Sequence, residues 1–187
     1  MTTAYLALLA LVGLGRLLEL RISRRNQQKL EKLGVRKISE PHFRWMVFTH
    51  GAVLACAAAE VILLHRPLIP ALAITMAALL VFANALRWWV IGTLAGHWNV
   101  EVMASSRVGV VTAGPYRWVR HPNYVAVVIE LFALPMIHTA WITALAGTLA
   151  NMEILRRRLR VEEGVLLADP AYLSTMGEKP RFLPKLF

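Results

Sequence analysis

Two long apolar runs, at residues 43–64 and 68–91, limit what this chain can fold into more than any other feature of its sequence. As a helix, each run is long enough to cross the roughly 30 Å of hydrocarbon in a lipid bilayer. Backbone groups in lipid have no water to bond with, and a helix satisfies them within the segment itself. The two runs therefore predict an all-α integral membrane protein.

Three further apolar stretches, at residues 4–20, 124–137 and 140–155, bring the expected number of transmembrane helical segments to about five. Arg16 and Glu19 lie in the last turn of the first stretch, and we expect both side chains to extend to the membrane interface. The last two stretches are short and are joined by a tight link directly after Pro135. They are expected to form a helical hairpin.

The composition favours a membrane protein over a nucleic-acid-binding one. Hydrophobic residues make up 57% of the 187 residues, charged residues only 17%, and the mean hydropathy is +0.52. These values lie outside the range of ordinary soluble domains. The net charge is +10, but the basic residues lie between the apolar runs and form no single basic face. Their expected partners are the head groups of membrane lipids, not nucleic acid.

The distribution of Lys and Arg predicts the orientation of the chain. The link at residues 65–67 contains one of the 21 basic residues, and the hairpin link contains none. The others lie in the first loop at 21–44, the middle loop at 92–120, the C-terminal tail, or helix ends that face them. If successive helices cross the membrane in opposite directions, all of these basic residues lie on the same side. The positive-inside rule identifies that side as the cytoplasm. We expect a multi-pass protein with its N-terminus outside and its C-terminus in the cytoplasm.

We found no internal repeat, so residues 1–187 are expected to form one domain. Residues 1–91 would supply three helices and the basic first loop, and residues 92–187 the cofactor-binding and catalytic region. The first loop is either an interfacial helix or a cytoplasmic extension of the first helix, and Gly34 is a plausible stop. His42 and His50 lack the spacing and carboxylates of a metal site, so we predict no metal.

The middle loop ends in a polar stretch, GPYRWVRHPNY at residues 114–124, directly before an apolar run. Pro122 suits the first turn of a helix, and a helix N-terminus beside His121 is a natural seat for a carboxylate. The glycines and valines before it allow close backbone approach and offer an apolar wall for an aromatic ring. An ordinary turn would explain the glycines and Pro115, but not the donors gathered at residues 120–124.

A second polar cluster follows the last apolar stretch. Arg158 and Glu162 are four residues apart, so they share one face of a helix. They either form a surface ion pair of about 0.3–0.5 kcal/mol or line a functional site. Glu130 and Asn151 lie inside apolar stretches, where polar groups are usually functional or paired. For Glu130, structural pairing and catalysis are both open.

Together the two clusters resemble the signature of the isoprenylcysteine carboxyl methyltransferase family, whose members are membrane enzymes that use S-adenosylmethionine. The resemblance covers residues 114–124, the hairpin, an Arg-x-x-x-Glu-Glu-x-x-Leu block at 158–166, and Tyr172 with Leu183-Pro184. The chain differs from eukaryotic members in its shorter N-terminal part. It also lacks the family's extra acidic residues before the glutamate pair and has Glu178 where an arginine is expected.

The resemblance implies a cytoplasmic pocket for S-adenosylmethionine. Arg158 falls where the family keeps an arginine that contacts the substrate, and we expect it to act in substrate binding and catalysis. The cofactor-binding residues that the resemblance implies are Val108, Gly109, Val110, Val111, Tyr116, His121, Pro122, Asn123, Tyr124 and Glu162.

Two stretches of the first half, at residues 19–26 and 42–60, resemble a bacterial branch of the family that is linked to type III polyketide synthases. That branch methylates hydroxyls of alkylpyrones or phenolic lipids. The resemblance implies an O-methyltransferase of the bacterial inner membrane, whose lipid-tailed, acidic acceptor enters laterally from the bilayer. The alternatives are carboxyl methylation of a prenylcysteine-like substrate, a phospholipid N-methyltransferase, and a sterol-type membrane reductase. A neutral amine suits Arg158 poorly, and the middle loop is small for the phosphate contacts that a reductase needs.

Overall fold

The computed structural model describes residues 1–38, 43–104 and 109–184, and these residues are mostly helical. Three of the helices, α1, α2 and α3, are long and apolar enough to cross a membrane, and α4 is a shorter apolar helix. The predicted all-α class is confirmed. The elements in chain order are α1 (Thr2–Lys32), β1 (Arg36–Lys37), α2 (Phe43–Leu63), α3 (Pro70–Leu94), the 3-10 turn η1 (Ala95–His97), β2 (Met103–Ala104), the 3-10 turn η2 (Gly114–Arg117), α4 (Pro122–Met136), α5 (Trp141–Leu166) and α6 (Pro170–Met176).

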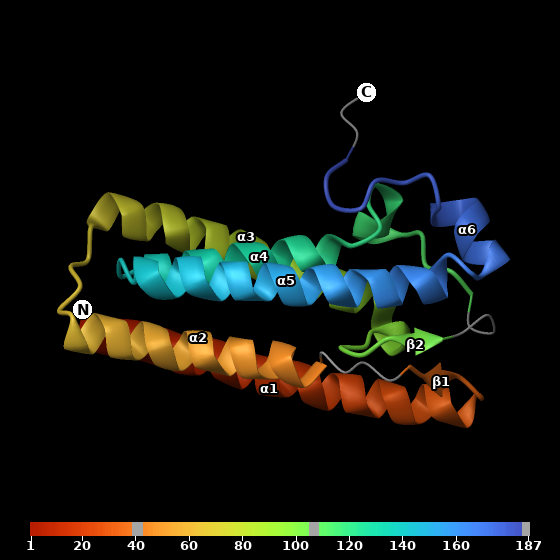
Figure 1. Cartoon of the computed structure of the whole chain (residues 1–187), viewed down its shortest axis with the longest axis horizontal. Helices are drawn as coiled ribbons and strands as arrows, with labels where there is room; N and C mark the ends of the chain where they lie inside the picture. The colour runs from red at the N-terminus through yellow and green to blue at the C-terminus, as the bar shows by residue number, and fades with distance from the viewer. Residues whose placement is uncertain (39–42, 105–108, 185–187) are drawn as a thin grey trace.

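The long helices pack in two layers that run along a common direction (Figure 1). In one layer α1 and α2 lie side by side, and in the other α4 packs against both α3 and α5. The layers meet in an apolar core that includes Tyr5, Leu80 and Leu134. Large apolar side chains such as Phe48 and Ile74 are exposed on the outside. Exposed apolar surface of this kind fits helices that face lipid.

Helix α1 continues beyond the apolar stretch at residues 4–20, which agrees with the alternative that the first loop begins as an extension of the first helix. It runs to Lys32, so the first half of that loop, residues 21–32, is a continuation of the first helix. Gly34 follows with a φ of 79°, and its N–H donates to the Glu31 carbonyl at 2.9 Å. A glycine in the left-handed region that bonds back to the last turn is a common helix stop. The stop predicted at Gly34 is confirmed.

Arg16 and Glu19 point into the protein, so the prediction that they extend to the interface was wrong. Arg16 lies 2.8 Å from Glu19 and 3.3 Å from Glu130, and Arg87 lies 2.9 Å from Glu130 and 3.6 Å from Glu19. We call these four residues the membrane cluster; they join α1, α3 and α4. Because α1 continues well past Glu19, these charges lie far from a helix end, and pairing is what makes their burial tolerable. Glu130 is therefore structurally paired.

The predicted hairpin of α4 and α5 is joined by residues 137–140. In that link, Thr139 donates its Oγ1 hydroxyl to the Pro67 carbonyl at 2.6 Å, so the hairpin link contacts the link between α2 and α3. The Glu60 carboxylate accepts the N–H groups of Ile142 and Thr143 at 3.2 and 2.8 Å. A carboxylate is stabilising at a helix N-terminus. Both short links thus meet at one end of the molecule.

The strands, α6 and the C-terminal tail gather at the opposite end (Figure 1). β1 pairs antiparallel with β2, so that Arg36 faces Ala104 and Lys37 faces Met103. The sequence did not predict this two-residue strand pair. It brings the first and middle loops together at one end, as the charge distribution predicted.

Candidate active site

A cavity of about 560 Å³ lies between the two helix layers. Residues from α1 to α5, from the middle loop and from the start of α6 line it. The volume is within the range of roughly 300–1,000 Å³ that is typical of small-molecule sites. One end of the cavity is polar and lies among the loops, and the other extends toward the membrane cluster.

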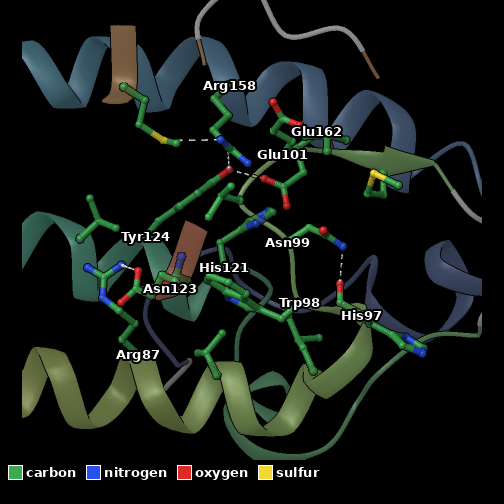
Figure 2. A pocket seen from close by; sticks show the side chains of 18 of the residues that line it. Arg87, His97, Trp98, Asn99, Glu101, His121, Asn123, Tyr124, Arg158 and Glu162 are labelled. Carbon is green, nitrogen blue, oxygen red and sulfur yellow. Dashed lines mark hydrogen bonds and ion pairs between the residues drawn. The ribbon is translucent and has the colours of Figure 1, made fainter. Parts of the chain in front are cut away.

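Three polar side chains meet in this cavity, and we call Tyr124, Arg158 and Glu162 the cavity cluster (Figure 2). Arg158 and Glu162 lie one turn apart on α5, and Tyr124 projects from the first turn of α4. The Tyr124 hydroxyl accepts a hydrogen bond from Nε of Arg158 at 3.0 Å and donates one to the Glu162 carboxylate. Arg158 is only 7% exposed, so the alternative of a surface ion pair was wrong.

Glu163 points to another side of α5 and binds a different set of residues. It accepts hydrogen bonds from Nε2 of His121 at 3.1 Å and Nη2 of Arg181 at 2.7 Å, and Nη2 of Arg120 lies 3.1 Å from it. The backbone N–H groups of Arg120 and His121 donate to the carbonyls of Pro180 and Arg181, both at 2.9 Å. We call Arg120, His121, Glu163 and Arg181 the tail clamp, because they hold the C-terminal tail against the start of α4.

The tail clamp also orients a wall of the cavity. The His121 ring stacks on Tyr124 with the ring centroids 5.3 Å apart. Since Nε2 of His121 is bound to Glu163, the Nδ1 edge is what remains for a ligand. Sequence reasoning missed Glu163 and Arg181. The sequence feature that could have revealed Glu163 was the pair of adjacent glutamates, Glu162 and Glu163. Neighbouring residues on a helix point about 100° apart, so the two carboxylates face different surroundings.

Buried polar atoms without partners indicate where a ligand fits. Oδ1 of Asn99 and Oδ1 of Asn123 are buried and have no hydrogen-bond partner among the described residues, and both residues line the cavity. Buried polar atoms are nearly always bonded in folded proteins. Burial, and then the nearby Glu162 carboxylate, raises the pKa of Tyr116 well above its usual value and that of Tyr172 to about 12. Both hydroxyls therefore stay protonated at neutral pH and can donate.

The structure brings most of the residues that the sequence singled out to this one cavity. Pro122 does not line it; this residue begins α4 and is buried behind the cavity wall. Val108 and His42 lie outside the described residues. The nine residues that do line the cavity are Gly109, Val110, Val111, Tyr116, His121, Asn123, Tyr124, Arg158 and Glu162.

The far end of the cavity was not predicted. There the cavity is lined by three members of the membrane cluster, by His50, and by a groove between α1 and α2. Leu17 and Val47 line the groove and are 58% and 42% exposed, so it opens on the lipid-facing surface. A Cβ at Gly51 would meet no atom of the described residues within 4 Å, whereas one at Gly13 would lie 3.4 Å from Leu54. The groove is therefore open beside Gly51 and narrows at Gly13.

A model of the isoprenylcysteine carboxyl methyltransferase (ICMT) family matches residues 72–168. The match extends from α3 past the end of α5 and contains the whole cavity cluster.

Two bacterial proteins are similar in sequence. The uncharacterized protein YpbQ of Bacillus subtilis (strain 168) is 28% identical over 159 residues, which are 85% of this chain and 94% of YpbQ. An uncharacterized protein of Haemophilus influenzae is 33% identical over 90 residues, 48% of this chain and 52% of that protein.

A solved structure, that of the eukaryotic intramembrane Ras methyltransferase ICMT, is similar with a TM-score of 0.54 and 22% sequence identity. The similarity covers 74% of this chain and 52% of that one, so the chain spans about half the length of that structure. At this level of identity the likeness concerns the fold.

Proposed function

Because the chain belongs to the isoprenylcysteine carboxyl methyltransferase family, and is thus a membrane methyltransferase that uses S-adenosylmethionine, we propose that it methylates an oxygen of a lipid-tailed, acidic acceptor. The favoured acceptor is the hydroxyl of an alkylpyrone or a phenolic lipid. The observation that carries this proposal is the shape of the cavity. A single cavity joins a buried cluster of polar side chains to an apolar groove that is open to lipid.

The loop end of the cavity fits the cofactor. The valines at 110 and 111 and Tyr116 offer an apolar wall for the adenine ring. The amide oxygens of Asn99 and Asn123 have no partner among the residues that the structure describes. Together with the Glu162 carboxylate, they would accept hydrogen bonds from amino and hydroxyl groups. Arg120 and the Nδ1 edge of His121 would face a carboxylate. When bound, the cofactor supplies a methyl group on a positively charged sulfur.

Arg158 is the residue best suited to bind the acceptor. Its Nε is held by the Tyr124 hydroxyl, and its Nη1 contacts the sulfur of Met46 at 3.5 Å, so the guanidinium is fixed in the cavity wall. A fixed guanidinium can bind an oxyanion and keep it ionised. Methyl transfer from a sulfonium depends on alignment of the reacting atoms and exclusion of water. A buried cavity with a rigid cation meets both needs.

The acceptor oxygen can belong to a hydroxyl or to a carboxyl group, because both arrive as anions when they are acidic. The hydroxyl is favoured by the resemblance of residues 19–26 and 42–60 to the alkylpyrone-methylating branch. Several members of those stretches, among them Glu19 and His50, line the cavity on the side toward the lipid. Carboxyl methylation of a prenylcysteine-like molecule is the second candidate. N-methylation of a phospholipid is disfavoured, because a cationic guanidinium repels an amine that becomes charged.

The test is incubation of the purified protein with labelled S-adenosylmethionine and a panel of alkylpyrones, alkylresorcinols and prenylcysteines, with the products identified by mass spectrometry. We expect label on the hydroxyl acceptors. Gly51→Phe should raise the KM of long-tailed acceptors about tenfold or more without changing cofactor affinity, because the ring would fill the open groove. Gly15→Phe is the matched control, since Gly15 is also unobstructed but does not line the cavity. Methylation of prenylcysteine alone would contradict the hydroxyl assignment.

We propose the orientation that the charge distribution predicts, with the loop end of the bundle in the cytoplasm. Single cysteines at positions 32 and 179, in a Cys56→Ala background, should then both be labelled from the cytoplasmic side. Labelling of either from the opposite side would overturn this orientation.

A further inference from the structure

His50 is a second reactive side chain in the cavity, and the function proposed above does not use it. It lies on α2, one helical turn after Met46, and both residues line the cavity. The sulfur of Met46 contacts Nη1 of Arg158 at 3.5 Å. Residues four apart on a helix share one face. His50 and Arg158 therefore belong to the same part of the cavity, toward the groove that opens to lipid.

The hydrogen bonding of the His50 ring leaves its second nitrogen available. Nδ1 lies 2.8 Å from the Met46 carbonyl oxygen, which can only accept, so Nδ1 carries a proton. In the neutral ring, Nε2 then has a lone pair. Nε2 makes no hydrogen bond in the part of the chain that the structure describes. A lone pair is thus presented next to the cavity.

The charges around His50 come from every helix that borders this region. Arg16 and Glu19 face the region from α1, Arg87 from α3, Glu130 from α4 and Arg158 from α5. The membrane cluster pairs its own two cations with its own two carboxylates. Among the described residues, neither carboxylate bonds to the His50 ring, and both are already paired with Arg16 and Arg87.

We propose that His50 accepts the proton of the acceptor hydroxyl, and that this extends the acceptors from acidic enols to phenols that are neutral at pH 7. The inference rests on the proposed hydroxyl acceptor. A phenol has a pKa near 10, so Arg158 alone would meet mostly the protonated form. The phenolic proton passes to Nε2, which leaves an imidazolium and a phenolate beside the guanidinium. The oxygen lone pair is then free to form the new bond to carbon, and the imidazolium returns its proton to water.

The first experiment needs no cofactor. An alkyl-tailed chromogenic phenol, whose phenolate has its own absorption band, is titrated into the purified protein. We expect the bound phenol to ionise at a lower pH than the free phenol, and His50→Gln to lose most of that shift. Gln keeps polarity and can still donate to the Met46 carbonyl, but it is not a base. His138→Gln is the matched control, because His138 is a buried histidine that does not line the cavity.

The second experiment compares acceptors of different acidity. His50→Gln should lower kcat/KM about 100-fold for an alkylresorcinol, the usual effect of losing a general base, and less than about threefold for an acceptor that is already ionised. Imidazole added to His50→Ala should restore part of the lost rate. Should His50→Gln fail to fold, the wild-type protein still gives a test. Its rate in heavy water should then fall more for the phenol than for the ionised acceptor.

An unchanged ionisation of the bound phenol and an equal loss of rate for both acceptors would overturn the role of His50 while leaving the hydroxyl function intact. The two proposals are separable in this way. If the wild-type protein binds S-adenosylmethionine but methylates only carboxyl acceptors, then the proposed acceptor itself fails, and the role of His50 fails with it.

Discussion

The membrane cluster and the cavity cluster use the same kinds of side chain in different ways. In the membrane cluster, two guanidiniums contact two carboxylates from three helices at 2.8 to 3.6 Å. In the cavity cluster, one guanidinium and one carboxylate both bond to the Tyr124 hydroxyl. The amide oxygens of Asn99 and Asn123, which have no hydrogen-bond partner in the described part of the chain, line the same cavity. The first cluster pairs its charges with one another, and the second lies where bonding capacity is left for a ligand.

This difference separates folding from function. Removing a charge from the membrane cluster leaves its partners buried without a counter-ion, so the effect should fall on stability. Removing a charge from the cavity cluster takes away a group that we assign to a ligand, so the effect should fall on binding or turnover. A membrane-cluster variant that loses turnover and keeps its stability, or a cavity-cluster variant that loses only stability, would contradict this separation.

The largest effect is expected for Glu130→Gln. This change leaves Arg16 and Arg87 with one carboxylate between them, and breaking a buried pair costs about 3–5 kcal/mol. The free energy of unfolding, measured in detergent with added denaturant, should fall by that amount. The variant that remains folded should bind S-adenosylmethionine with nearly unchanged affinity. Normal stability combined with lost turnover would show that the membrane cluster acts in catalysis.

A smaller effect is expected for Glu163→Gln in the tail clamp. The change removes charge-assisted hydrogen bonds to His121 and Arg181, but Arg181 is half exposed and its bond is screened by solvent. We expect a loss of about 1–2 kcal/mol, faster proteolysis of the C-terminal tail, and weaker cofactor binding through the released His121 ring. Limited proteolysis and calorimetry would measure these.

The control for this change is Glu153→Gln on the same helix. Among the described residues, Glu153 is bound only to the exposed side chains of Arg156 and Arg157. Its replacement should leave the tail and cofactor affinity unchanged. A tail that is equally resistant in Glu163→Gln and wild type would show that the clamp does not hold it.

The sequence alone predicted those features of the fold and the site that depend on spacing within one segment. Arg158 and Glu162 are four residues apart, so helical periodicity alone predicts that they share a face, and Pro122 predicts where α4 begins. Apolar run lengths predicted α2 and α3 to within a few residues. Spacing along one segment could not predict the bond between Tyr124 and Arg158, which are 34 residues apart on different helices.

The errors arose where tertiary contacts override a local pattern. Charges at the end of an apolar stretch normally extend to the interface, but here α1 continues and its charges find partners on α3 and α4. The tail clamp was missed because nothing local to Arg181 indicates that the tail folds back onto α4. His50 was weighed as a metal ligand and as part of the stretch that resembles the bacterial branch, but not as a base, since its cavity position depends on how α2 packs against the other helices.

The central claim is that the two charged residues of the cavity cluster have different roles: Glu162 binds the cofactor, and Arg158 binds the acceptor. The most direct measurement is kcat together with the cofactor Kd for Arg158→Lys and Glu162→Gln, side by side. Arg158→Lys should lower kcat about tenfold or more with the Kd nearly intact, because lysine keeps the charge and loses the planar fork. Glu162→Gln should raise the Kd about tenfold and change kcat little at saturation. If both variants keep normal kcat and Kd and lose only a little thermal stability, the two residues are a structural pair and the claim is wrong.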